Sequence, residues 1–136
     1  MPMDVVLVGG GHAHVHVLTN FAMRPVPGAR VTLIARDLAT PYSGMLPGVI
    51  AGLYRPEQAH IDLVKRAAAT GTRLIHAEAN GLDHAAKRVL LTHRPPIAYD
   101  LLSIDVGIAP SLTPIAGAEA HGIAVKPIGS FLRKIN

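Results

Sequence analysis

Residues 5–18 read VVLVGGGHAHVHVL, and this stretch decides the fold of the chain. Four apolar residues lead directly into three glycines, and a helical apolar pattern follows. This order is typical of a buried parallel strand that turns tightly into a helix, the first half of a dinucleotide-binding βαβ unit. We predict that Gly9 adopts the backbone angles of the tight turn. We also predict that Gly11, which has no Cβ, lets a pyrophosphate approach the main chain.

The glycine fingerprint departs from its usual form at the third glycine position, where His14 stands. That position normally allows close packing of helix and strand. On a helix the side chains of His12 and His14 point about 200° apart, so they cannot converge on a metal ion. His12 and His16 have the i, i+4 spacing of helical zinc ligands, which leaves a metal site as the weaker alternative. We expect no metal, with His12 near the phosphates and His14 tucked against the sheet.

Composition narrows the class of protein. The chain has 136 residues, the size of one domain, with 49% hydrophobic and 16% charged residues, so it can form a core. It contains no cysteine, which excludes disulfides and thiol chemistry within this stretch. No apolar run approaches the roughly 18 to 20 residues that span a bilayer, and the N-terminus leads into a strand, not a signal peptide. We therefore expect a cytoplasmic protein without a transmembrane segment.

The basic balance of the chain does not indicate a nucleic-acid partner. Its formal net charge is +4 and its pI is about 9.9, but the lysines and arginines are scattered along the sequence. Only three tyrosines and two phenylalanines supply aromatic rings. No basic stripe interleaved with aromatic residues results, so we expect no nucleic-acid binding.

The remaining patterns outline alternating helices and strands. We expect a helix over about 11–22, a turn at 24–28 and a strand at 30–35, joined as a right-handed parallel crossover. Asp62 should cap a helix that stops at Gly71. Further strands are expected at 73–79, 88–92, 99–106 and 123–125, with turn signals at Asn80-Gly81, near Lys87 and at 94–96. Residues 40–53 read as an apolar loop that leads into a short helix and lines a site.

Three segments together resemble a known family. GGG at 9–11, TPYSGMLPG at 40–48 and YDLLSIDVG at 99–107 occur in its order and at its spacing. The chain is similar to the N-terminal part of FAD-dependent pyridine nucleotide–disulfide oxidoreductases of the type II NADH dehydrogenase kind. Within these it most resembles the branch fused ahead of selenophosphate synthases, which would link it to selenium metabolism. The resemblance covers essentially the whole chain.

The resemblance implies an α/β fold, a Rossmann-like FAD/NAD(P)-binding domain in three layers (ββα). Its central sheet would be parallel, with a small antiparallel β-meander. Residues 1–136 would form the first half of a split FAD-binding domain. The NAD(P)H domain and the C-terminal FAD segment would be absent. Such a fragment is expected to be inactive alone and to self-associate through open strand edges.

The resemblance also implies which residues hold FAD. Gly9–Gly11 would meet the pyrophosphate, 42–47 would lie beside the flavin, and Glu78 with Ala79 would meet the adenine. The family often has an acidic residue for the adenosine ribose where this chain has Ala35, followed by Arg36. The complete set of implied cofactor-binding residues is Gly9, Gly10, Gly11, His12, Ala35, Arg36, Tyr42, Ser43, Met45, Pro47, Glu78, Ala79 and Gly107.

The expected function is that of the FAD-binding part of a flavin-dependent oxidoreductase. Hydride would pass from NAD(P)H to FAD and then to a small-molecule acceptor such as a quinone, which allows peripheral membrane association of the full-length protein. No serine stands in a Gly-x-Ser-x-Gly context, and few catalytic side chains are needed where a cofactor carries the chemistry. Two alternatives remain. One is a single NADP-binding Rossmann module, with Arg36 reading a 2′-phosphate. The other is a nonenzymatic nucleotide-binding domain.

Overall fold

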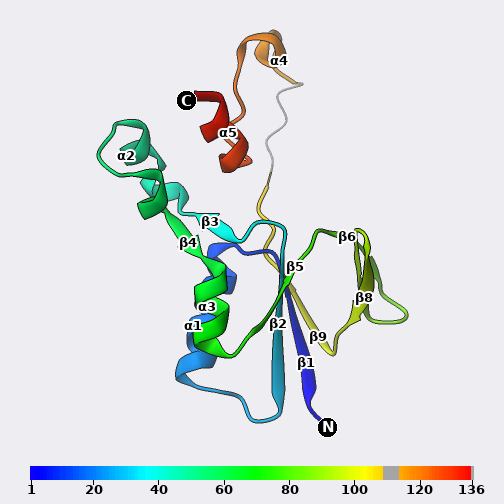
Figure 1. Ribbon diagram of the computed structural model, residues 1–136. Coiled ribbons are helices and arrows are strands. Elements are labelled where there is room, and N and C mark those ends of the chain that lie inside the picture. Colours follow the sequence, from blue (N-terminus) through cyan, green and yellow to red (C-terminus); the bar gives the residue numbers. More distant parts are fainter. Residues whose placement is uncertain (109–113, 136) are drawn as a thin grey trace. The chain divides into compact units, whose positions relative to one another are not determined.

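The computed structural model describes residues 1–108 and 114–135 of the chain (Figure 1). It divides the chain into two compact units, Met1–Tyr42 with His60–Val106 and Ser43–Ala59 with Gly107–Asn136. The first unit contains β1 (Met3–Val8), α1 (His12–Met23), β2 (Ala29–Ala35), β3 (Ala39–Pro41), β4 (His60–Asp62), α3 (Leu63–Thr70), β5 (Arg73–His76), β6 (Ala79–Asp83), β7 (Arg88–Leu91), β8 (Arg94–Ala98) and β9 (Leu101–Ile104). The second contains η1 (Ser43–Met45), α2 (Leu46–Ile50), η2 (Pro56–Ala59), α4 (Ala118–His121) and α5 (Ile128–Ile135).

A four-stranded parallel sheet organises the first unit. Its strand order is β5-β2-β1-β9, so β1 lies in the interior of the sheet. Val5 is in register with Val31 on β2 and with Leu101 on β9. The predicted strand–helix–strand crossover is therefore confirmed, and the α/β fold class with it.

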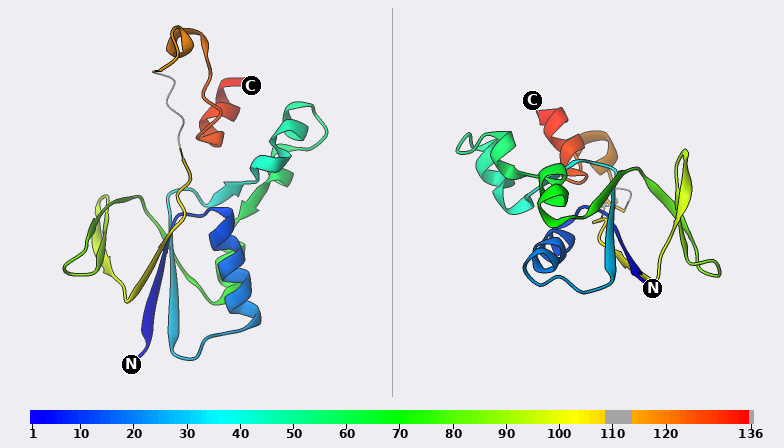
Figure 2. Two further views of the ribbon diagram at one scale, coloured as in Figure 1. Left: turned by 180° about the vertical axis from the view of Figure 1, so that it is seen from behind. Right: turned by 60° about the horizontal axis from the view of Figure 1, so that its bottom comes forward.

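Different layers cover the two faces of this sheet. Helices α1 and α3 pack together on one face, and the antiparallel meander β6-β7-β8 covers the other (Figures 1 and 2). Val5 and Leu7 join a core cluster with Leu18 of α1, whereas Val6 and Val8 join a second cluster that includes residues of β7. Alternate side chains of β1 thus enter two different cores, which explains its unbroken apolar sequence.

Helix α3 begins and ends where its sequence predicts. The Asp62 carboxylate accepts a hydrogen bond from the main-chain N–H of Lys65, with 3.0 Å between the atoms. Gly71 follows the last turn with a φ of 65°, in the left-handed region that glycine adopts without strain.

The meander corrects two turn predictions. Asn80 and Gly81 lie within β6, so the turn predicted there is wrong. The turn predicted near Lys87 is confirmed: it spans 84–87, and the Asp83 carboxylate accepts the Ala86 N–H at 2.9 Å. Consequently the strand expected over 73–79 divides into β5 and β6. Gly81 does not form a turn because it pairs with Leu90 of β7. The turn forms instead after Asp83, whose side chain stabilises it.

The predicted break at 94–96 is also a strand. Pro95 and Pro96 lie in β8, which is an edge strand of the meander and pairs only with β7 among the described residues. Proline lacks an N–H, and an edge strand tolerates that loss on its open side. The chain reverses just before β8, where His93 has a φ of 57°.

The C-terminal strand expected at 123–125 is absent, and helices α4 and α5 lie on either side of that segment. Three apolar residues between Gly122 and Lys126-Pro127 are too few to pair without a neighbouring strand. In the described parts of the chain, no helix combines the length and apolarity that a bilayer crossing requires.

Candidate nucleotide-binding site

The glycine turn lies at the carboxyl end of β1. Gly9 has a φ of 97°, and its N–H donates to the carbonyl of Ile34 at 2.8 Å. A Cβ at Gly9 would overlap the main-chain carbonyl of Asp105, which follows β9. The backbone angle confirms the tight turn predicted at Gly9 and shows that only glycine fits this position.

The fold itself gives a reason for the missing side chain at Gly11. Its φ of −67° and ψ of 172° are ordinary extended values that any residue adopts. A Cβ on Gly11 would overlap the side-chain carboxylate of Asp105. The missing side chain therefore makes room for the protein's own carboxylate, so close approach of a phosphate is not needed to explain this glycine.

The first turn of α1 presents main-chain donors at the carboxyl edge of the sheet. Gly11 is the N-cap, and the turn has neither a side-chain cap of its own nor an acidic residue. The N–H of His14 donates to the Asp105 carboxylate at 3.2 Å. Among the described residues, the N–H groups of His12 and Ala13 donate no hydrogen bond. With the positive end of the helix dipole, these two groups favour an anion.

His14 lies between the helix and the sheet, as predicted, with 1% of its surface exposed. Its Nδ1 lies 2.7 Å from the carbonyl oxygen of Gly9, and its Nε2 lies 2.9 Å from the hydroxyl of Ser103 on β9. Because a carbonyl only accepts, Nδ1 carries the proton, and in this tautomer Nε2 accepts from the Ser103 hydroxyl. The imidazole stands where a third glycine usually lets the backbones of the helix and the strand pack closely.

His12 contacts Tyr42 at the same end of the unit. Their ring centroids are 4.9 Å apart and the ring planes are tilted by 58°. The Nε2 atom of His12 is buried and has no hydrogen-bond partner within the described chain. His16, one turn further, is exposed, and the described residues contain no cluster of three potential metal ligands. His12 Nε2 is therefore free to bind a group placed beside Tyr42.

Two carbonyl groups at the end of β2 accept hydrogen bonds at the end of β5. The carbonyl of Ala35 accepts the N–H of Ala77 at 3.1 Å, and that of Arg36 lies 2.9 Å from His76 Nε2. The Ala35 side chain is buried in the core cluster beneath α1. The exposed Arg36 guanidinium donates to Asp37 from two nitrogens at 3.3 Å. Arg36 is thus engaged with a neighbouring carboxylate.

Glu78 and Ala79 connect the parallel sheet to the meander. The carbonyl of Glu78 accepts the N–H of Thr92 at 2.9 Å, and Ala79 is in register with Leu91 of β7. The Glu78 side chain is exposed. The main chain at Glu78 and Ala79 therefore pairs with β7 and with Thr92, the residue that follows it.

The other predicted site residues belong to the second unit. Ser43 and Met45 lie in η1, and Pro47 in the first turn of α2, which confirms the short helix expected within 40–53. Gly107 has a φ of 74°. The structure therefore brings Gly9–His12 together with Tyr42 in the first unit, while Ser43, Met45, Pro47 and Gly107 are described only within the second.

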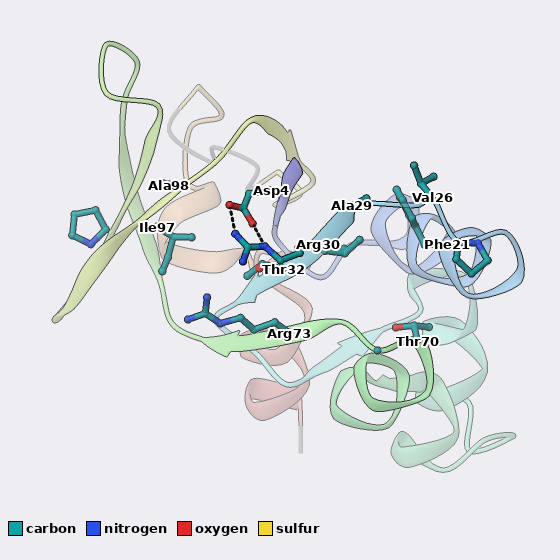
Figure 3. A pocket seen from close by; sticks show the side chains of 14 residues that line it. Asp4, Phe21, Val26, Ala29, Arg30, Thr32, Thr70, Arg73, Ile97 and Ala98 are labelled. Atoms are coloured by element: carbon teal, nitrogen blue, oxygen red, sulfur yellow. Dashed lines mark hydrogen bonds and ion pairs between the residues drawn. The ribbon is translucent and has the colours of Figure 1, made fainter. Parts of the chain in front are cut away.

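A cleft of about 590 Å³ opens at the opposite, amino ends of β1, β2 and β5 (Figure 3). On its wall the Arg30 guanidinium donates to both carboxylate oxygens of Asp4, at 2.8 and 2.7 Å. These hydrogen bonds lower the pKa of Asp4. The side chain of Arg73 lies nearby (Figure 3). The cleft lies away from the glycine turn, and the Asp4 carboxylate on its wall is paired with Arg30.

Sequence reasoning missed three residues of the turn. Asp105, which no sequence motif singled out, contacts Gly9, Gly11 and His14. Ser103 holds His14, and Thr40 donates its hydroxyl proton to the Gly10 carbonyl. One signal was present: Ser103 and Asp105 stand near the carboxyl end of the strand expected over 99–106, and the glycine turn lies at that edge in parallel sheets.

Solved structures show which fold this is. A sulfide:quinone oxidoreductase from the hyperthermophilic bacterium Aquifex aeolicus matches 88% of the chain at 23% identity and a TM-score of 0.74. A NAD-dependent persulfide reductase from A. fulgidus matches 88% at 22% identity, with a TM-score of 0.71. NDH2 from Plasmodium falciparum, in complex with NADH, matches 88% at 17% identity, with a TM-score of 0.70.

The chain has a Rossmann-like dinucleotide-binding fold. It spans 27%, 24% and 25% of the length of these three structures, respectively, so the likeness concerns one part of each. No protein-family profile and no curated protein sequence matches the chain. At these identities the comparison establishes the arrangement of the elements only.

Proposed function

We propose that the turn from Gly9 to Ala13 binds the pyrophosphate of FAD, and that the chain forms the first part of an FAD-binding domain. The observation that carries this proposal is the pair of unpartnered N–H groups of His12 and Ala13. They stand at the positive end of α1 and at the carboxyl edge of a parallel sheet, where nucleotide phosphates bind in this class of fold.

The residues of the first unit fit the cofactor at several points. His12 Nε2 needs a hydrogen-bond partner, and a ligand beside the exposed Tyr42 ring could supply it. The main chain at Ala35 and Glu78 would border the adenosine, and the Arg36–Asp37 pair its ribose. In the second unit, Ser43, Met45, Pro47 and Gly107 would lie beside the flavin and its ribityl chain. When bound, FAD accepts hydride and passes electrons on.

We assign electron transfer to the full-length protein, as a flavin-dependent NAD(P)H oxidoreductase. The similar structures include a protein that acts on sulfide and quinone and another bound to NADH, which supports a small-molecule donor and acceptor. The motif at 40–48 further favours the branch fused to selenophosphate synthase. Residues 1–136 would then be half of a split FAD domain, inactive without the nicotinamide-binding part.

The unpaired N–H of His12 can be tested with two variants at one position. His12→Pro removes the side chain and the N–H, whereas His12→Ala removes the side chain alone. Proline is tolerated here because position 12 is the first of the helix and Gly11 has the extended angles that precede proline. We expect His12→Pro to bind FAD about tenfold more weakly than His12→Ala, as for loss of a charge-assisted hydrogen bond.

FAD binding would be measured by quenching of flavin fluorescence, with circular dichroism to show that both variants fold. Equal affinities of the two variants for FAD would show that the His12 N–H does not bind the cofactor and would contradict the proposed site at the first turn of α1. Tighter binding of NADPH than of FAD, with a loss specific to Arg36→Ala, would support the NADP-binding module instead. Binding of FAD by a full-length protein that NADH cannot reduce would support a nonenzymatic domain.

A further inference from the structure

Asp105 places a carboxylate at the helix end where the phosphates are proposed to bind. It follows β9, and its N–H donates to the Val8 carbonyl at 2.8 Å. Its own carbonyl accepts the N–H of Gly11 at 3.3 Å, and its carboxylate accepts the N–H of His14 at 3.2 Å. The aspartate thus caps α1 from the end of β9. Two main-chain hydrogen bonds and one to its carboxylate hold it there.

This cap changes what the helix end offers a ligand. One of the donors of the first turn is already occupied, and the two that remain belong to the preceding residues, His12 and Ala13. A negative charge beside these donors offsets part of the positive helix end and repels an incoming phosphate. The repulsion grows with the charge of the ligand, whereas the number of free donors is the same for every nucleotide.

We propose that Asp105 is a specificity-determining residue that makes this turn select pyrophosphate diesters over nucleotides with a terminal phosphate. This inference rests on the proposed function. The pyrophosphate of a dinucleotide or of ADP-ribose carries about two negative charges, and that of ADP about three at pH 7, since a terminal phosphate has a second pKa near 6. The additional charge of ADP meets the Asp105 carboxylate. A dinucleotide such as FAD therefore occupies the turn in preference to free nucleotides.

The test compares two ligands and two variants by isothermal titration calorimetry. ADP and ADP-ribose share the adenosine diphosphate group and differ in the terminal charge. Asp105→Asn removes the charge while the amide oxygen still accepts the His14 N–H. Asp100→Asn is the matched control: it stands before β9, at its other end, and its carboxylate accepts the N–H of Asp4 at 2.7 Å.

The expected result is a change in selectivity. In Asp105→Asn the ratio of the Kd for ADP to the Kd for ADP-ribose should fall about fivefold at low salt, whereas Asp100→Asn should keep the wild-type ratio. In the wild type alone, added salt should lower the same ratio, because screening weakens repulsion of the more highly charged ligand. This second measurement does not depend on the folding of a variant.

The outcomes separate this inference from the proposed function. If both ligands bind and Asp105→Asn leaves the ratio unchanged, or strengthens both equally, the selectivity role is wrong while the nucleotide site stands. If the wild-type ratio does not change with salt, the electrostatic origin is wrong. If neither ligand binds the wild-type chain, the site itself is refuted, and the role of Asp105 with it.

Discussion

Ser103 donates its hydroxyl proton to Nε2 of His14 across the contact between β9 and α1, with 2.9 Å between the two atoms. The opposite ring nitrogen donates to the Gly9 carbonyl at 2.7 Å, so one imidazole links three segments at the glycine turn. In the usual fingerprint a glycine brings helix and strand together by its small size. Here a buried histidine makes the same connection through hydrogen bonds.

Replacing either partner should destabilise the chain. We expect Ser103→Ala to lower the free energy of unfolding by about 1–2 kcal/mol, as a buried acceptor loses its donor. His14→Ala should lower it by about 3 kcal/mol, because a cavity and an unsatisfied Gly9 carbonyl are added. The double variant should lose less than the sum in urea unfolding. Additive losses would show that the two side chains do not interact.

Gly9 and Gly28 offer a comparison of two glycines with positive φ. Both have left-handed angles, 97° and 78°, but a Cβ at Gly28 would meet no atom within 4 Å. Gly28→Ala should therefore cost only about 1–2 kcal/mol of backbone strain. Gly9→Ala adds a clash with the Asp105 carbonyl, so it should lower the free energy of unfolding by clearly more than Gly28→Ala does. Similar melting temperatures of the two variants would contradict the close packing of β9 against the turn.

The Asp4–Arg30 pair predicts a specific pH dependence. Hydrogen bonds from Arg30 lower the pKa of Asp4 below its ordinary value of 3.8. A lowered carboxyl pKa stabilises the folded chain above pH 3.8, and this contribution is lost as the pH falls through the folded pKa. In Arg30→Gln the pKa of Asp4 should rise towards its ordinary value, as NMR titration of the Asp4 side chain would measure. An unchanged pKa would refute the interaction; Arg94→Gln serves as the control.

The edge of β9 should mediate self-association. Among the described residues β9 pairs only with β1, and Leu101 and Ile104 are each 54% exposed. An open edge with exposed apolar residues favours pairing with another chain. Light scattering should show concentration-dependent oligomers, and Leu101→Lys should shift them towards monomer. A wild-type chain that stays monomeric at high concentration would refute this prediction.

The sequence predicts the local parts of this fold well. The strand before Gly9, the cap at Asp62 and the end of α3 at Gly71 each follow from neighbouring residues. In the meander the turn near Lys87 follows from the sequence, but the strand positions of Gly81 and of the edge prolines do not, because they depend on which strands pair. Asp105 was missed for the same reason: it bonds to His14 across 91 positions of sequence, and no local pattern reveals such a contact.

The position of β9 in the sequence has a consequence for folding. Strand β1 pairs with β2 after a short crossover, but its partner β9 comes far later in the sequence, with Val5 in register with Leu101. Closing so long a loop is slow compared with forming nearby contacts. During synthesis Gly9–Gly11 would leave the ribosome long before Ser103 and Asp105, whose contacts complete the turn. We therefore expect the nucleotide-binding turn to be the last part of the parallel sheet to acquire its native geometry.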